Sequence, residues 1–165
     1  MQTQRILKHL LTTRAKVNTA FPRSALTAIE SAIKASESAH YGEIRFVVEG
    51  ALDGMPLFKG QSSKDRAIDL FSHLRIWDTE FNSGVLIYLL LADRQVEIIA
   101  DRGIHAKAGT VAWTAICREM ETAFRSGNFQ EGVVRGVQAL TQQLTEHFPV
   151  QTGNHNDLPD EPLVL

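Results

Sequence analysis

A short polar segment ahead of a long apolar run carries the residues best suited to chemistry. In WDTEFNSG, residues 77–84, the oxygen-bearing side chains of Asp78, Glu80 and Asn82 alternate, and Gly84 follows them. A hard cation such as Ca²⁺ takes about six to eight oxygen ligands, and a glycine lets backbone carbonyls turn inward. The spacing does not match an EF-hand loop. The segment therefore predicts a divalent-cation site that recruits further oxygens from elsewhere, with simple turn formation by Asp78 and Asn82 as the alternative.

Asp101 is the expected source of a further oxygen ligand. Two apolar segments, 85–91 and 96–100, are separated only by Asp93-Arg94-Gln95, which predicts an antiparallel hairpin. In such a pair the residues before the first strand and after the second meet at one end of the sheet, whereas Asp93 and Arg94 lie at the other. The predicted metal ligands, for calcium in the first place, are therefore Asp78, Glu80, Asn82 and Asp101.

Arg102 and His105 follow directly and are the candidate residues for binding an anionic ligand. Arg102 could hold a phosphate or carboxylate, and His105 could exchange a proton near neutral pH. The alternative is that Asp101 and Arg102 form an ordinary surface ion pair, which contributes less than about 1 kcal/mol. No residue is assigned as a catalytic nucleophile.

Several kinds of site lack their sequence motifs. The chain has no GxGxxG, P-loop, GxSxG or kinase motif and no HxxxH or HExxH spacing. Its single cysteine, Cys117, excludes a CxxC pair and an internal disulfide, and its place on the apolar stripe of a helix predicts a packing role. We therefore expect no nucleotide, flavin, haem or zinc cofactor.

The elements that must position these residues alternate in type along the chain. Apolar residues recur at helical spacing in several segments, and Glu43–Gly50 alternates as a strand does. The uncharged run 85–91 predicts a strand that is covered on both faces. The fold class is therefore α/β, a three-layer α/β/α sandwich with a mixed sheet, a central antiparallel hairpin and helices on both faces. The expected helices are 1–20, 22–41, 64–77, 110–127 and 128–148.

Gly132 and Gly136 lie four residues apart on the last of these helices. This spacing permits close approach of another backbone, either in a dimer or within the same fold. We favour close approach within the fold.

The composition is that of an ordinary globular domain, with 44% hydrophobic residues, 22% charged residues and a net charge of −2. The chain has no overall basic excess, so a nucleic-acid partner is not expected. The amino-terminal end of the chain is basic, whereas its carboxyl-terminal end is acidic. We divide the chain into a basic amphipathic helix (1–20), an α/β domain (21–148) and a polar acidic tail (149–165), which we expect to be flexible or loosely docked.

The basic helix has two interpretations. It could dock to an anionic membrane surface or to a protein partner. Alternatively, it could lie on its own domain with its basic side in solvent. The longest uncharged apolar run, Gly84–Ala92, is less than half of the ~20 residues that a spanning helix needs, and the start has no signal-peptide pattern. We expect no transmembrane segment and a cytoplasmic location, with peripheral membrane association as an option.

The segment LRIWDTEFNSGVLIYLLLADRQVEIIADRGI, residues 74–104, resembles the TPM domain family. The resemblance extends from about Phe21 to Phe148, with GEIRFVVE as the first strand and FRSGNFQEGVVRGVQAL as the closing helix-turn-helix. It implies an α/β/α sandwich. It also implies properties of relatives: many are exported or membrane-tethered, some bind calcium, and acid phosphatase activity is attributed to a plant thylakoid relative.

Two departures from the family pattern weaken the implied calcium site. Many relatives have an acid ahead of the glycine that opens the apolar strand, where this chain has Asn82-Ser83-Gly84. A later acid is replaced near Ala108 or Gly109.

Two functions follow from these observations. The first is a non-catalytic binding or assembly module that binds a protein partner, with a membrane surface as an optional location. The alternative is a metal-assisted acid phosphatase for phosphate esters, in which Asp78, Glu80 and Asp101 hold the ion and Arg102 balances charge.

Overall fold

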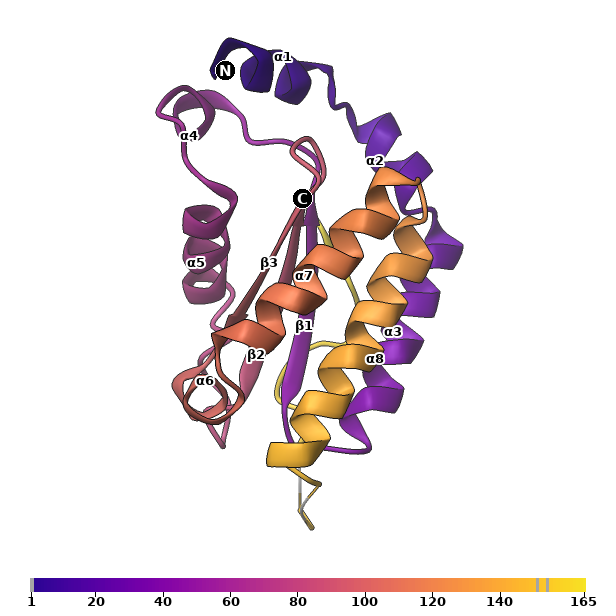
Figure 1. Ribbon diagram of the computed structural model, residues 1–165, viewed down its shortest axis with the longest axis vertical. Coiled ribbons are helices and arrows are strands. Elements are labelled where there is room, and N and C mark those ends of the chain that lie inside the picture. Colours follow the sequence, from indigo (N-terminus) through magenta and orange to yellow (C-terminus); the bar gives the residue numbers. More distant parts are fainter. Residues whose placement is uncertain (1, 151, 154) are drawn as a thin grey trace.

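A four-stranded sheet with helices on both faces forms the protein (Figure 1). The computed structural model describes residues 2–150, 152–153 and 155–165. The strand order is β3-β2-β1-β4, and β1 runs parallel to both β2 and β4, whereas β2 and β3 are antiparallel. The α/β/α sandwich with a mixed sheet is thus confirmed. The strands are β1 (Glu43–Glu49), β2 (Gly84–Leu90), β3 (Gln95–Ala100) and β4 (Leu163–Val164), and the helices are α1 (Gln2–Leu11), α2 (Arg14–Ala20), α3 (Arg23–Glu37), α4 (Gly54–Phe58), α5 (Ser63–His73), α6 (Arg102–Ala108), α7 (Thr110–Arg125) and α8 (Phe129–His147).

The predicted hairpin is present. β2 pairs with β3 from Val85 opposite Ala100 to Leu90 opposite Gln95. Every residue of β2 is buried, because both faces of this strand are covered by helices. The segment before β2 and the segment after β3 therefore meet at one end of the sheet, and the β2–β3 turn lies at the other.

Alternate strand residues face two separate apolar clusters. Phe46 and Ile87 pack with α3, α7 and α8, whereas Val47 and Tyr88 pack with α4 and α5 on the opposite face. Cys117 on α7 is half-buried against the first cluster, and burial raises the pKa of its thiol to about 12. This agrees with the predicted packing role, because little reactive thiolate exists at neutral pH.

Two glycines of α8 allow close packing against α7. A Cβ atom on Gly132 would lie 2.9 Å from the Cβ atom of Ala123, and one on Gly136 would lie 2.4 Å from the Sδ atom of Met120. The spacing of Gly132 and Gly136 therefore allows close approach of α7 within the same fold, as predicted.

The amino-terminal segment differs from the single helix predicted over residues 1–20. α1 ends at Leu11 and α2 begins at Arg14. Thr13 has the extended conformation typical of an N-cap, and the Thr12 hydroxyl donates a hydrogen bond to the Lys8 carbonyl. Threonine has a lower helix propensity than the residues around it, so the break falls at two adjacent weak helix formers.

The carboxyl-terminal segment is not the loosely docked tail that its composition predicts. Leu163 and Val164 pair with Val47 and Val48 of β1 and complete the sheet. Leu158 is buried in the cluster beside α5. The apolar residues spaced among the acids dock this segment against the edge of β1.

Asp160 of this segment lies near two other carboxyl groups, those of Glu37 at the end of α3 and Glu43 at the start of β1. Glu43 accepts a hydrogen bond from the Leu158 amide at 3.3 Å, and Glu37 accepts one from the Ile44 amide at 2.9 Å. The pKa of Glu37 is raised to about 9, mainly by burial and to a lesser extent by the carboxyl groups of Glu43 and Asp160. Burial also raises the pKa of Glu43 to about 7. The docked segment therefore lies against carboxyl groups that favour their protonated forms.

A buried ion pair joins the end of β1 to α5. Arg66 donates two hydrogen bonds to Glu49, at 2.9 and 2.8 Å. The Tyr88 hydroxyl donates a third, at 2.6 Å, and its pKa is raised by burial and by Glu49. Three donors thus satisfy a carboxylate that is almost fully buried.

Candidate binding surface

The four predicted metal ligands lie at the end of the sheet where β2 begins and β3 ends. Asp78 is exposed and pairs with Arg75 at 3.2 Å. Glu80 is exposed, and its backbone amide donates a hydrogen bond to Asp157. Asn82 is exposed and has φ 50°, the left-handed conformation that asparagine adopts readily in turns. These three residues therefore lie in the turn and at the surface, and their role as metal ligands stays a prediction.

Asp101 is buried and acts as the N-cap of α6. Its Oδ1 atom accepts a hydrogen bond from the Arg102 amide at 2.6 Å, whereas its buried Oδ2 atom has no partner among the described residues. One orphaned oxygen does not make a calcium site, which needs about six to eight oxygens. Within residues 2–150, 152–153 and 155–165, no three His, Cys, Asp or Glu side chains are placed to hold one metal ion. The arrangement does not fit a calcium site of the predicted composition, and calcium binding stays a prediction.

Arg102 and His105 both lie on α6 and both are exposed. His105 lines a hollow beside β3, together with Trp113 and Glu97, and Arg102 is not part of that lining. The two predicted ligand-binding residues are therefore close in sequence but do not converge on one pocket.

A larger hollow lies at the opposite end of the sheet, outside the carboxyl ends of the parallel strands β1 and β2. We call it the carboxyl-edge hollow. It measures about 730 Å³, and α1, α2, the β2–β3 turn and the α7–α8 turn surround it. Ligands of open α/β sheets commonly bind at this edge. Its lining includes Lys8, Leu11, Lys16, Asp93, Arg94 and Phe129.

Polar contacts hold α1 beside this hollow. Arg5 donates hydrogen bonds to Asp93 at 2.9 Å and to the Gln61 carbonyl at 2.8 Å. The buried His9 accepts a hydrogen bond from the Leu52 amide through Nδ1, and its Nε2 atom lies 3.1 Å from Asp93. Because Nδ1 accepts, the ring proton of neutral His9 resides on Nε2 and faces the carboxylate.

The leucines of α1 face solvent. Leu7 is 56% exposed, Leu10 67% and Leu11 56%, and His9 is the only residue that the described part of this helix buries fully. Ile6 is half-buried against the cluster that contains Leu57. The interpretation in which α1 lays its apolar side on its own domain is therefore wrong for these three residues, which we call the leucine face.

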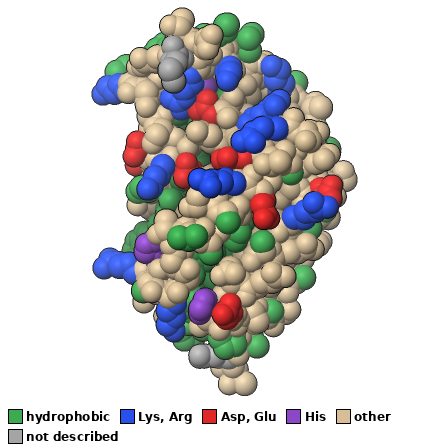
Figure 2. Space-filling view, viewed as in Figure 1, with side chains coloured by type: hydrophobic (Ala, Val, Ile, Leu, Met, Phe, Trp, Pro, Cys, Tyr) green, Lys and Arg blue, Asp and Glu red, His purple; other side chains and the backbone are tan. Residues whose placement is uncertain are grey.

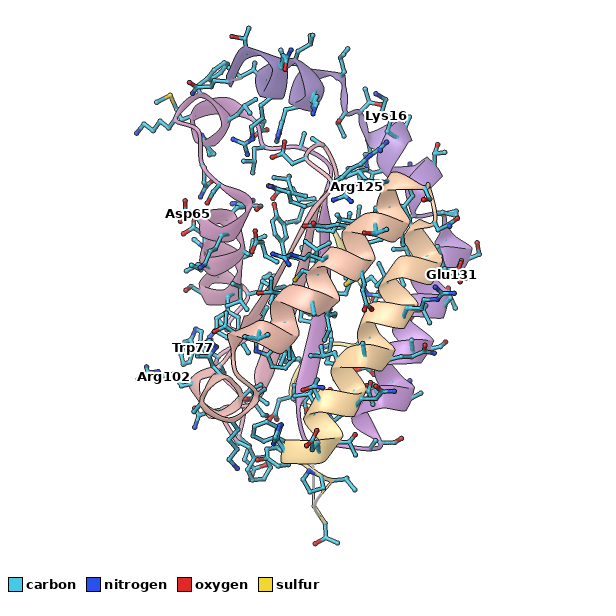
Figure 3. The ribbon with its side chains drawn as sticks, viewed as in Figure 1. Lys16, Asp65, Trp77, Arg102, Arg125 and Glu131 are labelled. Carbon is cyan, nitrogen blue, oxygen red and sulfur yellow. The ribbon has the colours of Figure 1, made fainter. Side chains whose placement is uncertain are left out.

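Basic residues are concentrated in the amino-terminal segment that carries the leucine face. Five basic residues precede the first acid, Glu30, in the sequence. Figure 2 shows Lys and Arg side chains clustered at the end of the molecule that carries α1. In Figure 3, Lys16 lies at this end, whereas Arg102 lies at the opposite end of the molecule. The five basic residues are Arg5, Lys8, Arg14, Lys16 and Arg23.

The fold is an α/β/α domain with a mixed sheet, and a hollow lies at the carboxyl edge of its parallel strands. The chain belongs to the TPM domain family, because the family model for the TPM domain matches residues 18–143. Among solved structures it is similar to the BA42 protein of the psychrophilic bacterium Bizionia argentinensis, determined by NMR. The two are 28% identical, with a TM-score of 0.76, over 86% of this chain and 93% of that chain. A comparison with curated proteins gives no match.

The matched range begins within α2 and ends within α8. The leucine face and the cations Lys8 and Lys16 thus lie outside it, as does β4. No helix in the described part of the chain has the length and apolarity needed to cross a membrane.

The sequence predicts its candidate ligands at the other end of the sheet. It predicts only a polar hairpin tip at Asp93 and Arg94 and gives no link between that turn and the basic start of the chain. The parallel pairing of β1 and β2 brings the segments that follow these strands to one edge of the sheet. His9 of α1 contacts both segments, at Leu52 and at Asp93. A helix far away in sequence cannot be assigned to that edge by local patterns.

Proposed function

We propose that this TPM-domain protein is a non-catalytic binding module that docks to an anionic membrane surface through α1. The observation that carries the proposal is the orientation of this helix. α1 buries a histidine and directs Leu7, Leu10 and Leu11 to solvent. A helix that served only to cover its own domain would bury its leucines.

The physical basis is the combination of an exposed apolar face with a basic surround. Interfacial helices bury their apolar side chains at the headgroup boundary, and anionic lipids attract the neighbouring cations by about 1 kcal/mol per Lys or Arg. Met55 and Phe58 on α4 are also exposed, and Phe58 and Leu10 line the same hollow beside α1. These side chains extend the apolar surface available for docking.

The metal-assisted phosphatase lacks comparable support. That function needs Asp78, Glu80 and Asp101 on one ion, but Asp78 pairs with Arg75 and Asp101 caps α6. The structure groups no three such side chains among the residues it describes.

Vesicle co-sedimentation tests the proposal. We expect the protein to bind vesicles that contain phosphatidylglycerol and to bind pure phosphatidylcholine vesicles at least about tenfold more weakly. The double variant Leu7→Gln/Leu10→Gln should lose at least about tenfold in affinity, because about 1 kcal/mol of apolar transfer per leucine is removed. The variant leaves Leu11 and the carboxyl-edge hollow intact.

Val111→Gln is the matched control, since Val111 is 85% exposed at the start of α7 and lies outside α1. It should bind vesicles as the unaltered protein does. Equal binding by Leu7→Gln/Leu10→Gln, or no preference for anionic vesicles, would remove the proposal. Thermal melts of all three proteins should agree, because the substituted side chains are exposed.

A further inference from the structure

We infer that the carboxyl-edge hollow is a binding site for one phosphate-bearing headgroup of an anionic lipid. This inference rests on the proposed membrane docking and adds a specific ligand to it. Docking by charge and leucines alone would need no such site.

Three unpaired cations line the hollow. Lys8, Lys16 and Arg94 are exposed, and none of the ion pairs found among the described residues includes them. The acid in the lining, Asp93, already faces Arg5 at 2.9 Å and His9 at 3.1 Å. The lining therefore carries three cations against one acid, and no acid among the described residues forms an ion pair with those cations, which suits a phosphate group.

Arg94 has a backbone conformation that costs free energy. Its φ is 52°, in the left-handed region that Gly and Asn adopt more readily than arginine does. Arg75 has a similar φ, 54°, so the conformation by itself does not mark a ligand site. It matters for the test, because asparagine adopts this conformation readily and can replace Arg94 without disfavouring the turn.

The walls of the hollow suit a lipid headgroup rather than a bare anion. Leu11 belongs both to the hollow and to the leucine face, and Leu91 and Phe129 supply further apolar lining. A headgroup in the hollow would therefore have its acyl chains next to the side chains proposed to enter the membrane. The volume of about 730 Å³ is within the range of small-molecule sites.

The test is a titration with monomeric short-chain phosphatidylglycerol, below its micelle concentration, followed by NMR chemical shifts of the backbone amides. We expect saturable one-to-one binding with the largest shifts at residues 8–20 and 91–94. Short-chain phosphatidylcholine, glycerol phosphate and inorganic phosphate form the comparison arms. Each should bind at least about tenfold more weakly. Equal binding of glycerol phosphate or inorganic phosphate would overturn the lipid assignment in favour of a free phosphate.

Arg94→Asn is the decisive variant, because it removes the charge and suits the left-handed turn. It should lower the affinity for short-chain phosphatidylglycerol at least about tenfold without lowering the melting temperature. Arg75→Asn is the matched control, since Arg75 is also exposed and also has a positive φ, 54°, but lies near the other end of the sheet. Unchanged affinity in Arg94→Asn, or an equal loss in Arg75→Asn, would overturn the inference.

The two proposals can fail separately. Leu7→Gln/Leu10→Gln should keep its affinity for the monomeric short-chain lipid within about twofold while it loses vesicle binding. If vesicles bind but Arg94→Asn has no effect on the short-chain lipid, the headgroup site is wrong and membrane docking stands. If the short-chain lipid binds but vesicles do not, membrane docking is wrong, and the inference, which rests on it, falls too.

Discussion

At the scale of single residues, the buried carboxylate of Glu49 depends on Arg66 to compensate its negative charge. Its carboxylate side chain is only 10% exposed, and Arg66 supplies the two charged hydrogen bonds that compensate burial. We expect Arg66→Met to lower the free energy of unfolding by about 2 to 3 kcal/mol, because an unpaired buried charge is left behind. Urea denaturation measures the change.

The matched control for this prediction is Arg135→Met. Arg135 pairs with Glu131 at 2.5 Å, but both side chains are more than half exposed. The pair resembles the Arg66 pair in chemistry and differs in burial, so its loss should cost less than about 1 kcal/mol. Equal losses in the two variants would show that burial does not govern the Glu49 pair.

Single residues also show how far sequence reasoning reaches. Gly84 was expected to let carbonyls turn toward a cation. It is needed instead because a Cβ atom there would lie 1.9 Å from the Ile76 carbonyl oxygen. Asp101 was predicted at the correct end of the sheet, yet it caps α6. Residue types and spacing predicted positions, whereas the roles depend on neighbours that only the tertiary structure supplies.

At the scale of elements, the contact of α7 with α8 depends on Gly132. A Cβ atom there would lie 2.9 Å from the Ala123 Cβ atom, which cannot move without the α7 backbone. Gly132→Ala gains up to about 1 kcal/mol in helix propensity but loses more by overpacking. We expect a net loss of about 1 to 2 kcal/mol in the free energy of unfolding.

A double variant checks the cause of this loss. Adding Ala123→Gly to Gly132→Ala removes the contacting Cβ atom, so the two substitutions should be less destabilising together than the sum of their separate effects. Strict additivity would indicate that the Ala123 Cβ atom does not limit the residue at position 132, and would leave the Phe124 ring of α7, whose Cε1 atom would lie 2.8 Å from the new Cβ atom, as the limiting contact.

The elements differ in how well the sequence predicted them. The β2–β3 hairpin and the helices that carry long apolar stripes were predicted because each contains its own periodic pattern. β4 has two residues, too few to show a period, and its pairing with β1 joins residues more than one hundred positions apart. The break between α1 and α2 depends on Thr12 and Thr13, a weak local signal within a longer amphipathic pattern.

At the scale of the whole molecule, ionisable groups of opposite type are separated along the strands. The cations of the carboxyl-edge hollow lie beside the end of β2, whereas Glu37, Glu43 and Asp160 gather near the start of β1. Glu37 and Glu43 favour their neutral forms, so this end contributes little negative charge. The orientation of the proposed docking is therefore set by the cations, with the carboxyl-edge hollow toward the membrane.

The acidic end makes stability depend on pH. The folded-state pKa values of Glu37, about 9, and Glu43, about 7, are raised above the ordinary value of 4.5 by burial. The folded state therefore binds these protons more tightly than the unfolded state does. Their stabilising contribution is complete below pH 4.5 and is lost as the pH rises through 7 and toward 9.

His40 acts in the opposite sense. Burial lowers its pKa from 6.5 to about 4, and its Nε2 atom lies 2.8 Å from the Ser36 hydroxyl. Its contribution is complete above pH 6.5 and is lost as the pH falls toward 4. Two carboxyl groups outweigh one histidine between pH 4.5 and 6.5, so stability should decline from about pH 5 to pH 9.

Glu37→Gln isolates the largest part of this dependence. The amide keeps an oxygen that can accept the hydrogen bond from the Ile44 amide, and it can donate to Asp160 at any pH. We expect this variant to exceed the unaltered protein in free energy of unfolding by at least about 1 kcal/mol at pH 9, and to have a flatter profile between pH 7 and 9. Urea denaturation at pH 6, 7, 8 and 9, followed by tryptophan fluorescence, measures both. Parallel profiles for the two proteins would show that Glu37 is not the carboxyl group that binds the proton as the chain folds.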